Sequence, residues 1–193
     1  MTETREIRSA VGVEVEDRLI KGYALTFNTM SELLPAKGLT FRETIKEGAI
    51  DGLIEKCDIV ALYQHESDAG VLARSRNNKG TLRLSIDDKG LYFEFEAPQT
   101  SLGDTVLQGI RRGDLDGCSF AFAVAEKGDK WTRQADGTYL REISKIAMLE
   151  DISVVVFQAY KDSTVINSRG LEIAEAEELD NYFNLLKLEI SNE

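Results

Sequence analysis

The stretch "LRLSIDDKGLYFEF" (residues 82–95) contains the clearest structural pattern in the sequence. Apolar residues alternate with mostly polar ones on both sides of a "DDKG" turn: Leu82, Leu84, Ile86, Leu91, Phe93 and Phe95. An alternation with a period of two places the apolar side chains on one face of a strand. Aspartate and glycine suit a tight turn between two strands. The stretch therefore predicts a β-hairpin with one buried face.

Runs with similar strand character lie on both sides of this hairpin, at residues 5–16, 18–28, 57–65 and 118–160. They are rich in valine, isoleucine and aromatic residues and are separated by polar turn segments, which is typical of strands. No internal repeat, linker or low-complexity segment divides the chain. With 193 residues, the sequence has the length of one domain with a sizeable core.

Three segments predict helices. The first is a short helix at residues 47–55, and the second is capped by Ser101, with Asp104 three residues further on as a loose capping box, and ends at Gly113. The third lies in residues 171–193, where apolar residues recur at helical spacing: Leu179, Tyr182, Phe183, Leu186 and Ile190. We expect this third helix to pack on the body of the domain; the alternative is an exposed helix that binds a partner. The predicted fold class is α+β, with about seven strands and about three helices.

Composition excludes several functions. The net charge of −11 disfavours general binding of nucleic acid, which needs lysine and arginine against phosphate. No apolar run reaches the length of about 18 residues that a membrane-spanning helix needs, and the first ten residues lack the apolar core of a secretory signal. We therefore expect an intracellular protein that does not bind membranes.

The chain has two cysteines and one histidine. A structural zinc site needs about four such ligands, so we expect no metal, and no sequence motif implies an organic cofactor. A disulfide is not expected in a reducing compartment. Any chemistry that needs a histidine base must use His65.

Two strand boundaries carry groups that could react. His65 ends an apolar strand just before a polar turn, and Ser119 follows the "DG" turn of "DGCSFAFAV" (residues 116–124). A serine hydroxyl is a weak nucleophile unless a positioned base removes its proton, so His65 and Ser119 form the one candidate pair of this kind. The alternatives are a surface histidine and a serine that merely begins a strand.

Carboxylates and arginines near these positions suggest further roles. Glu150 and Asp151 interrupt a strongly apolar strand, and one of them beside the imidazole would complete a triad. The alternative is a carboxylate that simply points to solvent, which the alternation of a strand would allow. Arg111 and Arg112 precede Ser119 and are candidates for supporting an oxyanion-stabilising loop. The alternative is that they are cations at the end of a helix, where the helix dipole favours them.

Six motifs occur in a familiar order: "KGYALTFN", "ETIKEGAID", "LYQHES", "KGLYFEFEAP", "RGDLDGCSFAF" and "LEDISVVVFQAY". Together they resemble the prohead proteases of tailed bacteriophages, which are serine peptidases that mature the capsid. The resemblance covers residues 18–169. The chain departs from the family pattern at Gln158, where proline is usual, at Ala121, where glycine is common, and at Glu66, where aspartate often follows the histidine. None of these departures touches the candidate triad.

The resemblance implies roles for particular residues. His65 matches the general base, Ser119 the nucleophile and Glu150 the third member, with Asp151 as the alternative acid. Among the candidates for oxyanion support we include Cys118, which neighbours Ser119. The family is distantly similar to the herpesvirus maturation proteases (assemblins), which use a second histidine as third member. Since this chain has none, an acidic third member is implied.

The resemblance also implies a fold and a setting. We expect a compact, assemblin-like β-barrel flanked by helices, with a protease domain at residues 1–170 and the amphipathic helix at 171–193. The expected function is that of a serine endopeptidase inside the immature procapsid, in the host cytoplasm. Its expected substrates are the scaffold region of the major capsid protein and its own chain, and self-association stays open.

Two other functions fit the sequence. One is a non-enzymatic capsid-assembly or scaffold component with the same fold, which binds through the segment 171–193. The other is an unrelated acidic β-barrel with a small-molecule pocket, in which His65 and Ser119 would lie too far apart for a hydrogen bond.

Overall fold

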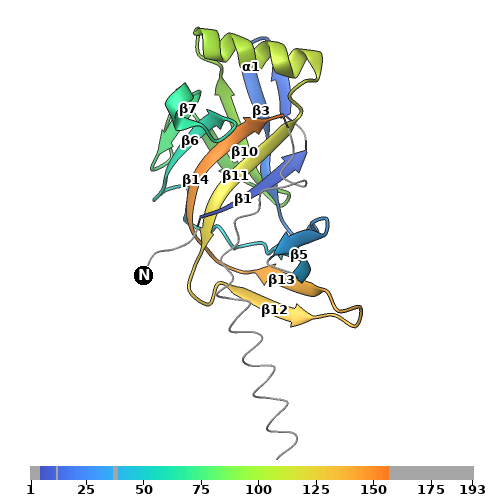
Figure 1. Cartoon of the computed structure of the whole chain (residues 1–193). Coiled ribbons are helices and arrows are strands. Elements are labelled where there is room, and N and C mark those ends of the chain that lie inside the picture. The colour runs from blue at the N-terminus through green and yellow to red at the C-terminus, as the bar shows by residue number, and fades with distance from the viewer. Residues whose placement is uncertain (1–4, 12, 37–38, 157–193) are drawn as a thin grey trace, which may run out of the picture.

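The computed structural model describes residues 5–11, 13–36 and 39–156. Within these residues strands dominate, and the one α-helix is α1 (Ser101–Arg112), which lies at one end of the molecule (Figure 1). The strands form one sheet of six strands and two sheets of four strands. The mixture of strands and helix agrees with the predicted α+β class.

The six-stranded sheet forms the centre of the molecule. Its order is β1 (Arg5–Val11), β11 (Gly117–Val124), β14 (Ile146–Val155), β6 (Asp58–Tyr63), β7 (Ala73–Arg76) and β8 (Lys79–Gly80). β14 pairs parallel with β6, while the other neighbours are antiparallel. β11 is almost entirely buried and β14 is buried from residue 151 to residue 155, as their apolar sequences predict.

The second sheet contains the predicted hairpin. Its order is β2 (Val13–Glu16), β3 (Leu19–Thr26), β10 (Gly90–Glu96) and β9 (Arg83–Ile86). Leu91 lies opposite Ile86, so the hairpin at residues 82–95 is confirmed. Gly90 is needed where β10 approaches β3, because a Cβ atom there would lie 2.0 Å from the carbonyl oxygen of Leu25.

The third sheet lies at the end opposite α1 (Figure 1). Its order is β12 (Asp129–Arg133), β13 (Tyr139–Ile143), β5 (Leu39–Ile45) and β4 (Leu34–Ala36). Phe41, Trp131 and Tyr139 pack together at this end, with ring centroids 5.0 Å apart for the Phe41–Trp131 pair. This small cluster is separate from the main core, which lies between the six-stranded sheet, the second sheet and α1.

A buried charge network joins β1 to the third sheet. We use this name for Glu6, Arg8, Glu43, Asp129 and Arg141. Arg141 binds Glu6, Glu43 and Asp129, and Arg8 binds Glu6 and Glu43. The pKa of Glu6 is held below its usual value because hydrogen bonds and charge from Arg141 and Arg8 outweigh the opposing effect of burial. Each charge in the network therefore has a partner of opposite sign.

Three of the expected features of the fold are not matched. The strands are more numerous than seven, the described residues contain one α-helix where two of the three helices were expected, and none of the three sheets closes into a barrel. The strand count was too low because long stretches contain several strands: the stretch 118–160 includes β11, β12, β13 and β14, which belong to two different sheets. Periodicity detects strands but does not show which edges pair, so it gives no information on closure.

The short helix expected at residues 47–55 is a series of turns. Gly48 and Gly52 have φ angles of 85° and 66°, a left-handed backbone that interrupts a helix. Ile50 and Ile54 are nevertheless buried, so these turns contribute side chains to the core. The only other helical turn of the described part is the 3₁₀ turn at Ser67–Ala69.

The second expected helix is confirmed as α1, with a correction of one residue at its start. Thr100, rather than Ser101, is the N-cap, and its side chain accepts a hydrogen bond from the backbone N–H of Gly103. Gly113 ends the helix in the left-handed conformation, with φ 76°. The third expected helix, in residues 171–193, lies outside the described residues.

Candidate active site

Three neighbouring strands bring the candidate residues together. On β11, Ser119 lies opposite Ser153 of β14, and Ser153 lies beside Leu62 of β6 in the parallel pairing. His65 follows β6 by two residues and Asp151 precedes Ser153 by two, so Asp151 and Ser153 share one face of β14. The strand ends thus converge on the hydroxyl of Ser119.

The side chains form a continuous chain of hydrogen bonds. His65 Nε2 lies 2.8 Å from Ser119 Oγ, and His65 Nδ1 lies 2.6 Å from Asp151 Oδ1. An ionised carboxylate only accepts hydrogen bonds, so Nδ1 carries the ring proton and donates a hydrogen bond to Asp151. Nε2 then has a free lone pair directed at the hydroxyl. This tautomer is the one in which imidazole can remove the proton of a serine.

Asp151 is buried and fully hydrogen-bonded. Its Oδ1 also accepts a hydrogen bond from the Ser153 hydroxyl at 2.8 Å, and its Oδ2 accepts one from the Arg5 guanidinium. Burial alone would raise the pKa of Asp151, but the hydrogen bonds from His65, Ser153 and Arg5 and the charge of His65 hold the pKa below its usual value. The carboxyl is therefore ionised at neutral pH.

A strained turn holds His65 at the end of β6. Gln64 and His65 have φ angles of 56° and 61°, which residues with a Cβ rarely adopt. The turn is fixed by backbone bonds from Gln64 N–H to Val154 and from Glu66 N–H to Tyr63. The Ser153 hydroxyl also accepts the N–H of His65, at 3.2 Å. Ser153 therefore positions both the backbone of His65 and the carboxylate that the ring contacts.

The geometry favours the alternative acid over the first choice. Glu150, the residue expected as third member, forms an ion pair with Arg5 at 2.7 Å and is partly exposed. Its neighbour Asp151 contacts the imidazole instead. The pairing of β14 with β11 skips Glu150, which lies at a β-bulge between Leu149 and Asp151. Both carboxylates therefore reach Arg5, but the contact with the imidazole belongs to Asp151, and the motif did not say which of the two would make it.

The candidates for oxyanion support lie elsewhere. Arg111 donates a hydrogen bond to the carbonyl oxygen of Asp17, and Arg112 pairs with Asp114 on the surface, at the end of α1. The alternative reading, in which they are cations at the end of a helix, agrees with this placement. Cys118 is fully buried in the main core, and burial raises the pKa of its thiol. The alternation of β11 therefore presents a hydroxyl, and not the neighbouring thiol, to His65.

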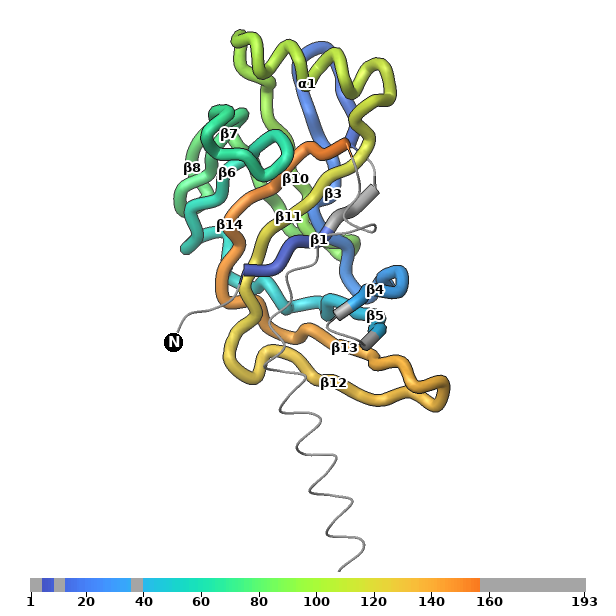
Figure 2. The backbone as a smooth tube through the Cα atoms, viewed as in Figure 1, coloured from blue at the N-terminus to red at the C-terminus, as the bar shows by residue number. Residues whose placement is uncertain are grey.

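β1 covers the nucleophile candidate. It runs along one edge of β11 while β14 runs along the other (Figure 2). The Ser119 hydroxyl lies 2.9 Å from the carbonyl oxygen of Arg8, which accepts its hydrogen bond. Ser119 is only 1% exposed. The hydroxyl thus has two acceptors, Arg8 and His65, for one proton.

Sequence reasoning missed Arg5 and Ser153. Ser153 could have been found, since its spacing of two residues from Asp151 on one strand places both on the same face. Arg5 could not have been found in this way, because it lies 146 positions from Asp151 and only the pairing of β1 with β11 brings them together.

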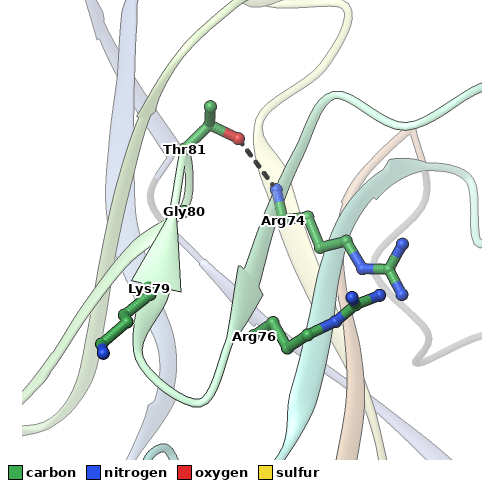
Figure 3. Close-up of a pocket in the computed structure, with 5 residues that line it drawn as sticks. All are labelled: Arg74, Arg76, Lys79, Gly80 and Thr81. Atoms are coloured by element: carbon green, nitrogen blue, oxygen red, sulfur yellow. Dashed lines mark hydrogen bonds between the residues drawn. The ribbon is translucent and has the colours of Figure 1, made fainter.

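A shallow surface pocket lies away from these residues, at the hairpin of β7 and β8 (Figure 3). Its lining consists of Arg74, Arg76, Lys79, Gly80 and Thr81. Arg74 and Arg76 both bind the carboxylate of Asp58, so their charge is already partly neutralised. This pocket lies at the opposite end of the six-stranded sheet from β1 and contains none of the candidate catalytic residues.

A hydroxyl, an imidazole and a carboxylate in this order form the arrangement by which serine hydrolases activate a nucleophile. A family model described as caudovirus prohead serine protease matches residues 4–178, so the chain belongs to that family. Membership supports a role as a serine protease in the maturation of bacteriophage capsids. Neither a curated protein nor a solved structure matches the chain. In the described part of the chain, no helix is both long and apolar enough to cross a membrane.

Proposed function

We propose that this chain is a serine endopeptidase that cleaves the scaffold region of the capsid protein, and its own chain, inside the immature procapsid in the host cytoplasm. The observation that carries the proposal is the continuous chain of contacts from Ser119 through His65 to Asp151, at 2.8 and 2.6 Å. Family membership supplies the reaction class and the capsid setting.

In the proposed reaction, His65 Nε2 takes the proton of Ser119 as Oγ attacks the carbonyl carbon of a peptide bond. The imidazolium that forms is stabilised by the ionised carboxylate of Asp151. It then gives the proton to the departing amine, which leaves an acyl-enzyme on Ser119. Water attacks this ester with His65 again as base, and the serine is regenerated. No metal ion or organic cofactor takes part.

Asp151 acts through orientation and charge. Its hydrogen bond to Nδ1 fixes the tautomer, and its negative charge favours the protonated ring in the transition state. Ser153 and Arg5 occupy the remaining acceptor positions of the carboxylate, so the carboxylate has one orientation. Ser153 and Arg5 are therefore positioning residues.

Co-expression with the capsid protein tests the proposal. We expect the intact masses of both chains to show fragments with the wild-type enzyme and none with Ser119→Ala. Ser101→Ala, an exposed serine in the first turn of α1, is the matched control and retains cleavage. Identical masses for wild type and Ser119→Ala would refute a peptidase role and favour an assembly component with this fold.

A further inference from the structure

The arrangement of β1 is hard to reconcile with open access to the nucleophile. An attacking hydroxyl must approach a substrate carbonyl carbon to about 3–3.5 Å. Around Ser119, the hydroxyl is hydrogen-bonded to Arg8 O and almost fully covered. An Arg8 carbonyl that accepts the hydroxyl proton competes with His65 for it. With β1 in place, the serine is thus both shielded and partly diverted from its base.

β1 has the geometry of a bound peptide. Its seven residues pair antiparallel with β11, with Ser9 directly opposite Ser119, so the strand extends to both sides of the nucleophile. Many proteins bind extended peptides by adding a strand to a sheet edge. The other edge of β11 is occupied by β14, which carries Asp151. The β1 side is therefore the edge of β11 that can be vacated while the triad stays intact.

The contacts of β1 define the chemistry of a replacement strand. Glu6 and Arg8 project from the face of β1 opposite to Arg5, and they bind Arg141 and Glu43 in the buried charge network. β1 contributes one negative and one positive charge, and the groups left behind, Glu43 and Arg141, still contact each other at 3.4 Å. Without β1, Arg141 would be available to bind an acidic residue of a peptide. Glu43 would be available to bind a basic residue two positions further along the same peptide.

We propose that β1 occupies the edge of β11 on which substrate peptides dock, and that substrate binds by exchange with β1. The favoured partner is an extended peptide with an acidic residue opposite Phe122 and a basic residue opposite Phe120, the positions of Glu6 and Arg8. Exchange conserves the ladder hydrogen bonds and the ion pairs of the buried charge network, whereas Arg5 leaves Asp151 and Glu150 together with β1. This inference rests on the proposed function, and it adds the binding edge, the peptide direction and two preferred residue types.

The first variant, the lock, holds β1 on β11 by a disulfide that can be reduced. Ala10 lies opposite Cys118, and directly opposed residues on antiparallel strands have Cα atoms about 4.5–5.5 Å apart, a separation suited to a disulfide. Ala10→Cys should therefore tether β1 to β11 under oxidising conditions and free it on reduction. Cys118 lies on the face of β11 opposite to Ser119, so the tether does not touch the triad. Oxidised Ala10→Ser, which lacks the second thiol, is the control.

A release variant acts in the opposite direction. Arg8→Glu places a carboxylate against Glu43 in a buried site, where like charges repel strongly. We expect β1 to leave the edge of β11 while circular dichroism still reports a folded sheet protein. Both variants are made in the full chain that also carries Ser119→Ala, so that binding is measured without cleavage.

The probe is a fluorescent peptide with the sequence of residues 5–11, and the readout is its anisotropy. We expect the release variant to bind at least about 100-fold more tightly than the oxidised lock, because an attached β1 competes at high effective concentration. Reduction of the Ala10→Cys disulfide should restore the weak peptide binding of the chain that carries Ser119→Ala alone. A peptide with glutamine at the positions of Glu6 and Arg8 should bind the release variant less tightly.

Two results would overturn the inference: equal binding to the locked and released proteins, or no binding to a folded release variant. The proposed function is judged separately, by Ser119-dependent cleavage of the capsid protein. Cleavage together with equal peptide binding would refute only the docking edge. The expected order of peptide binding without cleavage would refute only the peptidase.

Discussion

Two buried polar clusters meet at β1, and they differ in how their partners are arranged. On one face, Ser119, His65 and Asp151 form a line that ends in a hydroxyl with two competing acceptors. On the other face, the buried charge network is closed, because every carboxylate in it contacts a guanidinium. A hydroxyl proton with two alternative acceptors can move from one to the other, whereas a closed network of ion pairs holds strands together. Buried polar groups therefore catalyse or anchor according to whether their hydrogen bonding is fully determined.

The largest expected effect tests the chain of hydrogen bonds from Ser119 through His65 to Asp151. Asp151→Asn should reduce cleavage of the capsid protein by about 10⁴-fold, because an amide beside Nδ1 favours the wrong tautomer of His65. Glu150→Gln is the matched control, since it removes the neighbouring carboxylate, which pairs with Arg5 while Asp151 contacts the imidazole. Initial rates of fragment formation measure both. A larger loss in Glu150→Gln than in Asp151→Asn would return the role of third member to Glu150.

The next effect tests the closed network. Arg141→Met should lower the free energy of unfolding by about 3–5 kcal/mol, because it leaves buried carboxylates without a partner. Arg83→Met removes an exposed cross-strand pair with Glu94 and should cost less than about 1 kcal/mol. Urea unfolding followed by Trp131 fluorescence gives both values. Equal losses would mean that the network is not the anchor that its burial implies.

Acid should weaken both clusters. The pKa values of Glu6 and Asp151 are held below their usual 4.5 and 3.8 in the folded chain. A carboxyl with a depressed folded pKa stabilises the fold above its unfolded pKa, and this stabilisation is lost as the pH falls through the folded value. The free energy of unfolding should therefore decline below about pH 4.5.

The dependence on salt distinguishes the contribution of a buried carboxylate to acid stability from that of an exposed one. Asp58 is exposed, and hydrogen bonds from Arg74 and Arg76 lower its pKa to about 2. Glu6→Gln should flatten the acid decline both at low salt and at 1 M salt, where the Debye length is about 3 Å. Asp58→Asn should change the acid decline measurably only at low salt. Equal salt sensitivity would contradict the burial of the network.

The smallest expected effect gives a reference for an ordinary surface contact. Thr100→Ala removes the N-cap of α1 and should lower the free energy of unfolding by about 1 kcal/mol. Ser101→Ala should have a smaller effect, since Ser101 lies inside the helix. Thermal unfolding measures both, and the reverse order would restore Ser101 as the cap.

The sequence by itself determined the local elements. The period of two at residues 82–95 specified the hairpin. The capping residues at the start of α1 and Gly113 at its end predicted the bounds of the helix to within one residue. The single histidine limited the candidate catalytic pair to His65 and Ser119, and motif order indicated the protease family. These features depend on spacing within a few residues or on composition, and both are visible without a fold.

Only the tertiary structure decided which acid faces the imidazole and what covers Ser119, the candidate nucleophile. Adjacent carboxylates at 150 and 151 fit the same motif, and the register of β14 with β11 and β6 turns Asp151 to the ring. Arg5 and Arg8 reach the site because β1 pairs with a strand more than 100 positions away. Pairing between distant strands depends on the packing of the whole chain, so neither periodicity nor a short motif can predict it.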